Sequence, residues 1–134
     1  MAKYVIKLNV NQYENIYREI KLLLSSFLTE LYRYNKMIKN WNYYLKPIHI
    51  VVKKRSNGEI VKYIYYGRYW YRLARKPSGI KWIYIGREKP VRNLPDPPSN
   101  PVEGLVVKIA GDEVVVLTGS REIYELINSV LISS

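Results

Sequence analysis

The chain has 134 residues, with 22 Lys and Arg against 11 Asp and Glu, 14 Tyr and no Cys. This length predicts one domain with its own hydrophobic core, and the lack of Cys excludes disulfides, thiolate zinc sites and thiol nucleophiles. No apolar leader segment opens the sequence and no stretch approaches about 18 consecutive apolar residues, so we expect a cytoplasmic protein without a membrane span.

The net charge of +11 is concentrated in the middle of the chain. Residues 1–45 hold seven basic and three acidic side chains, residues 46–92 hold thirteen and two, and residues 93–134 hold two and six. The middle third therefore carries an excess equal to that of the whole chain, which solubility alone does not require. Such segregation favours a polyanionic partner.

The first third predicts a strand followed by a long helix. Residues 3–10 alternate and are β-prone, and Asn11 with Glu14 three residues later matches a capping box, so we expect the helix to begin there. An apolar stripe with spacings of four and three residues follows, made of Tyr13, Tyr17, Ile20, Leu24, Phe27, Leu31, Tyr34, Ile38 and Trp41. Apolar neighbours widen the stripe, which leaves two alternatives: packing on the protein's own sheet, or a homodimer seam along residues 13–41.

The middle third predicts a four-stranded antiparallel meander. Pro47 ends the helical region, and the next forty residues are rich in β-branched and aromatic residues. The expected strands are 48–53, 60–66, 69–74 and 80–85, joined by turns at 56–58, 67–68 and 75–79.

The last third predicts a proline-rich connector and a strand–strand–helix element. Five prolines fall between residues 90 and 101, which makes residues 93–103 an extended connector between a unit at 1–92 and an element at 104–134. In that element 105–109 and 113–118 form a hairpin, and Ser120 caps an amphipathic helix that we expect to pack on the same domain. The fold class is therefore α+β.

Aromatic residues alternate with cations in the predicted third strand. Neighbouring side chains on a strand point to opposite faces, so Trp70 and Arg72 share one face, which we expect to be exposed, while Tyr69 and Tyr71 share the other, which we assign to the core. The face of the next strand depends on the loop between them. With the loop at 75–79, Trp82 joins the exposed face; with a loop one residue shorter, Trp82 and Tyr84 turn into the core and Lys81 lies outside.

This mixture of cations and flat rings predicts a nucleic-acid-binding face, because cations neutralise phosphates and rings stack on bases. We expect DNA as the ligand in preference to RNA. The alternative is structural, since Tyr and Trp are common on half-buried sheets and basic edges prevent edge-to-edge pairing. The predicted binding residues are Lys53, Lys54, Arg55, Lys62, Arg68, Trp70, Arg72, Arg75, Lys76, Lys81, Trp82, Arg87 and Lys89.

Residues 59–90 contain Tyr-Tyr-Gly-Arg-Tyr-Trp-Tyr-Arg-Leu followed by Gly-Ile-Lys-Trp-Ile-Tyr-Ile-Gly-Arg. This segment resembles the short basic β-meander of arm-type DNA-binding domains in mobile-element integrases, and tyrosine-rich segments of small archaeal, plasmid and viral proteins. The resemblance implies that Arg68, Trp70, Arg72, Lys81 and Trp82 lie against duplex DNA. It implies no recombination, because the sequence contains no catalytic domain of that family. The overall composition also resembles that of proteins of thermophilic archaea and their viruses. If the protein is viral, we expect it to be virion-associated.

The residues give no basis for catalysis, a cofactor or a metal site. His49 is the sole imidazole and alternates with Ile on a predicted strand, where a structural role is favoured over a general base. Only Glu59 and Glu88 provide carboxylates within the basic segment, too few for a two-metal nuclease. Three non-enzymatic functions remain: a largely sequence-independent nucleic-acid-binding protein, a structural or assembly nucleoprotein, and a modulator that docks its basic face on an acidic partner of the transcription or replication machinery.

Overall fold

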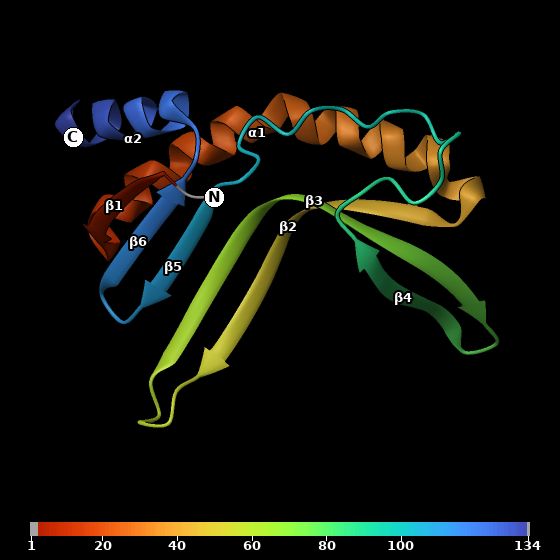
Figure 1. Cartoon of the computed structure of the whole chain (residues 1–134), viewed down its shortest axis with the longest axis horizontal. Helices are drawn as coiled ribbons and strands as arrows, with labels where there is room; N and C mark the ends of the chain where they lie inside the picture. The colour runs from red at the N-terminus through yellow and green to blue at the C-terminus, as the bar shows by residue number, and fades with distance from the viewer. Residues whose placement is uncertain (1–2, 134) are drawn as a thin grey trace.

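The computed structural model describes residues 3–133 and shows one antiparallel sheet with helices packed against it (Figure 1). The sheet order is β1-β6-β5-β3-β2, with β4 added beside β3. The elements are β1 (Tyr4–Asn9), α1 (Val10–Ile38), the short 3-10 helix η1 (Lys39–Trp41), β2 (Tyr43–Lys54), β3 (Ile60–Lys76), β4 (Gly79–Gly86), β5 (Val106–Ala110), β6 (Glu113–Thr118) and α2 (Arg121–Ser133). The predicted α+β class is confirmed.

Helix α1 begins two residues earlier than the sequence pattern predicts. The N-cap is Asn9, whose side-chain oxygen accepts a hydrogen bond from the Gln12 amide at 2.8 Å, while Gln12 accepts one from the Asn9 amide at 2.9 Å. A capping box is therefore present, but Asn11 and Glu14 do not form it. Gln at the third position of a helix forms the same hydrogen bond as Glu. Asn9 with Gln12 therefore matches the motif as well as Asn11 with Glu14 does, and the prediction chose the wrong pair.

The apolar stripe of α1 packs on the protein's own sheet, as the first of the two alternatives for this helix predicts. Tyr13 and the stripe residues from Ile20 to Ile38 are buried, whereas Tyr17 and Trp41 are exposed. The helix ends at Ile38, well before Pro47. Asn42 then takes a left-handed backbone conformation, φ 63°, that turns the chain into β2.

Strand β3 is continuous, so the prediction of two strands joined at 67–68 is wrong. The β2–β3 register shifts between the Lys46–Tyr69 pair and the Ile48–Tyr66 pair, so that Pro47 alone faces two residues of β3. Proline cannot donate a ladder hydrogen bond, and an extra residue on one strand bends and twists the ribbon. The turn residues at this place mark a bend within a strand, and the meander has three strands.

The bend divides the β2–β3 hairpin into two arms that diverge on the side away from α1 (Figure 1). In the first arm, residues 48–66, β3 pairs with β5; in the second arm, residues 43–46 and 69–86, it pairs with β4. Both β4 and β5 pair with β3, and β2 pairs with the opposite edge of β3 between Ile60 and Arg72.

The C-terminal hairpin and helix form as predicted and complete the same sheet. β6 pairs with β1 and β5 with β3, and the Ser120 hydroxyl accepts a hydrogen bond from the Ile123 amide at 3.3 Å. The proline-rich segment runs along α1 (Figure 1), where Leu94 and Val102 are buried in the core.

Candidate nucleic-acid interface

The β3–β4 register determines which rings share a face of the second arm. Leu73 pairs with Trp82 and Tyr71 pairs with Tyr84, and the strands join through a loop of two residues after Lys76. This is the alternative with the shorter loop, in which Lys81 shares the face of Arg72. Trp82 and Tyr84 nevertheless remain exposed, at 44% and 47%, because α1 covers the opposite face of the sheet.

Trp70 is the clearest correction to the predicted site. Its side chain is only 1% exposed and lies on the α1 side, where its ring meets Tyr34 edge-on at 6.3 Å between centroids. The alternation on β3 is as predicted, but Trp70 lies in the core, whereas Arg72 is exposed and Tyr69 is buried, as the sequence predicts. The tyrosines assigned to the core lie on the face that no helix covers in residues 3–133.

Eight rings on that face form an unbroken series across β2, β3 and β4, which we call the aromatic row. Neighbouring ring centroids lie 4.8–6.4 Å apart. The row runs through Tyr63, Tyr65, His49, Tyr69, Tyr84, Tyr71, Trp82 and Tyr44. Among the described residues none of these rings joins the main core cluster, and Tyr69 alone among the eight is buried.

Three lysines lie over rings of the aromatic row. The Lys46 ammonium is 4.7 Å from the ring centroid of Tyr71 and 4.9 Å from that of Trp82. At the other end of the row, Lys53 and Lys108 lie 5.4 and 5.9 Å from the ring centroid of Tyr63. Cations over ring faces at these distances are attracted by the ring quadrupole, so the row combines flat surface with positive charge at both ends.

Within residues 3–133 these three lysines form no ion pair, whereas several predicted binding residues do. Arg55 pairs with Glu59 at 3.3 Å, Arg68 with Glu103 at 2.8 Å, and Lys89 with Asp96 at 2.8 Å. The last contact holds the pKa of Asp96 below its usual range through a hydrogen bond and charge. Arg55, Arg68 and Lys89 are thus partly neutralised.

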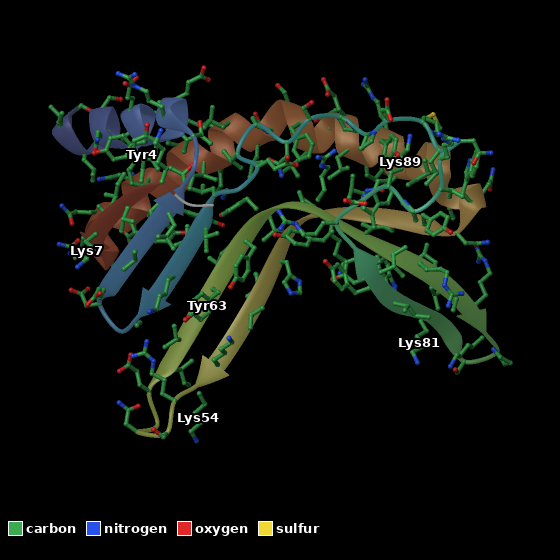
Figure 2. All side chains as sticks on the ribbon, viewed as in Figure 1. Tyr4, Lys7, Lys54, Tyr63, Lys81 and Lys89 are labelled. Atoms are coloured by element: carbon green, nitrogen blue, oxygen red, sulfur yellow. The ribbon has the colours of Figure 1, made fainter. Side chains whose placement is uncertain are left out.

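The structure places the other predicted residues on both faces of the arms, so it does not gather the thirteen into one surface. Figure 2 shows Lys54 and Tyr63 on one arm and Lys81 on the other. By register, the aromatic row's face carries Lys53, Arg75 and Trp82, and the opposite face carries Lys54, Lys62, Trp70, Arg72, Lys76 and Lys81, with Arg87 exposed just after β4.

The sequence interpretation missed Lys46, Lys108 and the ring-bearing residues other than Trp82. A signal was present in the odd-numbered tyrosines of β3, which continue on one face from Tyr63 to Tyr71. Alternation identifies residues that share a face, but it does not tell which face a helix covers. Lys46 lay within the region assigned to the end of the helix.

Groups that support other chemistry are scarce. Tyr69 is buried beneath His49 and Tyr84, and burial raises its pKa while Arg87 lowers it. In residues 3–133 no three His, Asp or Glu side chains come close enough to hold a metal ion. No helix in that range has the length and apolarity needed to cross a bilayer.

Comparisons with protein-family models, with curated proteins and with solved structures found no match for this chain. The geometry of the sheet is therefore the basis for the function proposed below.

Proposed function

We propose that this protein binds nucleic acid through the aromatic row and its lysines, without catalysis and largely without sequence readout. The observation that carries the proposal is the unbroken series of eight rings on the uncovered face of β2, β3 and β4. The need for a hydrophobic core accounts for the rings that are buried against α1. It does not account for the rings and lysines that lie together on the opposite face.

The row supplies two kinds of interaction. A base stacked on an aromatic side chain contributes about 1–3 kcal/mol whatever its identity, because every base has a π face. Ammonium groups at Lys46, Lys53 and Lys108 neutralise phosphates, which makes the affinity depend on salt. Neither interaction reads the edge of a base, so we expect weak sequence preference.

The cations on the opposite face of the arms add a positive field rather than a contact surface. Lys54, Lys62 and Lys81 are exposed there, and none forms an ion pair among the described residues. Such charge accelerates the association of a polyanion, and this acceleration becomes smaller as the ionic strength rises. These residues should affect the association rate more than the dissociation rate.

The test is a set of binding titrations with fluorescent oligonucleotides of mixed sequence at several salt concentrations. Tyr84→Ala should weaken binding about tenfold, the equivalent of one lost stacked base. Tyr17→Ala is the matched control, since that tyrosine is similarly exposed, at 43%, but lies on α1. Equal effects of the two substitutions would contradict the use of the aromatic row, and no binding to any oligonucleotide would contradict the function.

An assembly role has one supporting observation of its own. Ile50, Val52 and Ile60 lie exposed near the end of the first arm, and β2 is an edge of the sheet. Apolar side chains beside an unpaired strand edge are a site for association with another chain. Sedimentation of the protein with and without DNA tests this role: continuous coating with growing particles supports assembly, and a fixed small complex opposes it.

A further inference from the structure

A hollow of about 250 Å³ lies at the end of the aromatic row, between the last turns of α1 and the start of β4. Its walls include the rings of Tyr32, Tyr43, Tyr44 and Trp82, and the aliphatic side chains of Leu73 and Ile80. The walls are almost entirely apolar, so the hollow suits a flat, weakly polar group.

The charged groups around the hollow are all positive. Lys36 from the end of α1 and Lys39 from η1 line it, and no acidic side chain among residues 3–133 does. Neither lysine forms an ion pair within residues 3–133, and Lys36 lies over the Tyr32 ring at 5.5 Å. An apolar hollow with two cations beside it matches a ligand that joins a flat apolar group to an anion.

The polar side chain in the wall is not available for recognition. Asn35 donates to the Leu45 carbonyl at 3.0 Å and accepts from the Leu45 amide at 2.9 Å. Its amide is thus engaged with β2, and the residue is only 7% exposed.

We infer that the hollow takes an unpaired nucleobase, with its phosphates near Lys36 and Lys39, and that the ligand is therefore single-stranded nucleic acid. This inference rests on the function proposed above. Bases of a duplex are stacked and paired inside the helix and reach a side pocket only after flipping, which costs a few kcal/mol. A single strand presents its bases to aromatic surfaces without that cost.

Continuity with the aromatic row supports this ligand. Tyr44 and Trp82 belong both to the row and to the wall of the hollow, and their centroids lie 4.8 Å apart. Lys46 lies over the Trp82 ring from the side of the row. A nucleic-acid strand whose bases stack along the row can therefore place its last base in the hollow, because Tyr44 and Trp82 border both.

The first experiment compares three probes with the full chain: a mixed-sequence single strand, the same strand with abasic residues in place of its nucleosides, and its duplex. The three share a phosphate backbone, so the electrostatic contribution is present in each case. We expect the single strand to bind at least about tenfold more tightly than either other probe. Equal binding of the single strand and its abasic form would overturn the inference.

Substitution at Ile80 tests the hollow itself. Ile80→Glu places a carboxylate in the apolar wall at a position that is 49% exposed, which a folded chain tolerates. Ile132→Glu introduces the same charge at an exposed position of α2, away from the hollow. Ile80→Glu should lower single-strand affinity about tenfold beyond the control and leave duplex affinity close to that of the control.

Trp82 fluorescence gives a readout that does not depend on affinity. A base in the hollow should quench tryptophan emission on binding, and Trp82→Phe should remove that quenching while Trp70 and Trp41 stay in place. Quenching that persists in Trp82→Phe contradicts the inference. If the proposed function is wrong, none of the three probes will bind. If the duplex binds with the same affinity as the single strand, only the inference of a single-stranded ligand is contradicted.

Discussion

The indole rings of Trp70 and Trp82 lie on opposite faces of the same strand pair, one buried against α1 and the other exposed. The same residue type therefore serves the core on β3 and the candidate interface on β4. Substitutions at the two positions therefore test folding and binding separately.

Replacement of the two tryptophans should have opposite consequences. Trp70→Ala removes a buried ring that meets Tyr34 and should cost about 3–5 kcal/mol of stability. Trp82→Ala should leave the free energy of unfolding within about 1 kcal/mol, since the ring is half exposed, and weaken single-strand binding about tenfold. Urea denaturation and anisotropy on both variants check this. A Trp82→Ala protein that binds normally would contradict the interface.

Lys46→Gln should reduce the salt dependence of binding. The lysine lies over two rings of the row, so a phosphate near it releases about one counterion, and the slope of log affinity against log salt should fall by about 0.7 for a single strand. Lys21 also lies over a tyrosine ring, that of Tyr17, but on α1. Lys21→Gln is therefore the control, and an equal change in slope would place the phosphates elsewhere.

Substitution of Asn9 and of Asn11 tests the position of the capping box. Asn9→Ala removes the side chain that accepts from the Gln12 amide and should cost about 1 kcal/mol. Asn11→Ala changes an exposed residue within the first turn of α1 and should be neutral or slightly stabilising, because Ala has the higher helix propensity. Thermal or urea denaturation compares the stabilities of the two variants. If Asn11→Ala is the more destabilising substitution, Asn11 is the N-cap and the assignment to Asn9 is wrong.

Alkaline pH should destabilise the fold in a defined window. Burial raises the pKa of Tyr66 and of Tyr34 to about 12 and that of Tyr13 beyond its usual range. The unfolded chain loses these protons from about pH 10, whereas the folded chain retains them to about pH 12. Stability contributed by these groups is therefore full below pH 10 and is lost as pH rises toward 12.

Urea midpoints measured between pH 8 and about pH 11.5 report this loss. Tyr66→Phe removes one of the three phenols and should show a shallower decline over the same range. A midpoint that stays constant from pH 9 to about pH 11.5 would contradict the linkage.

The helices, the C-terminal hairpin and the strand-rich middle are predictable from the sequence, because periodicity and capping are local properties. The assignment of the sheet faces is not. Tyr71 and Trp70 are neighbours of similar character, and what decides between them is the position of α1, which no local pattern contains. For the same reason the alternating tyrosines were assigned to the core, and the hollow beside Trp82 has no signal in the sequence.

Gly67 shows the corresponding limit for turns. Gly-Arg between two β-prone runs is a reasonable turn signal, but the turn is replaced by a bend opposite Pro47, which lies twenty residues earlier in β2. Since the reason for the bend is on the partner strand, reading β3 alone cannot distinguish a bend from a turn.

The pairing of Tyr4 with Thr118 joins the first strand of the described chain to its last strand. During synthesis, β1 has no partner strand until β6 has left the ribosome, whereas β2, β3 and β4 pair with their sequence neighbours much earlier. We expect the arms that carry the aromatic row to form first and the β1-β6-β5 half of the sheet to close last.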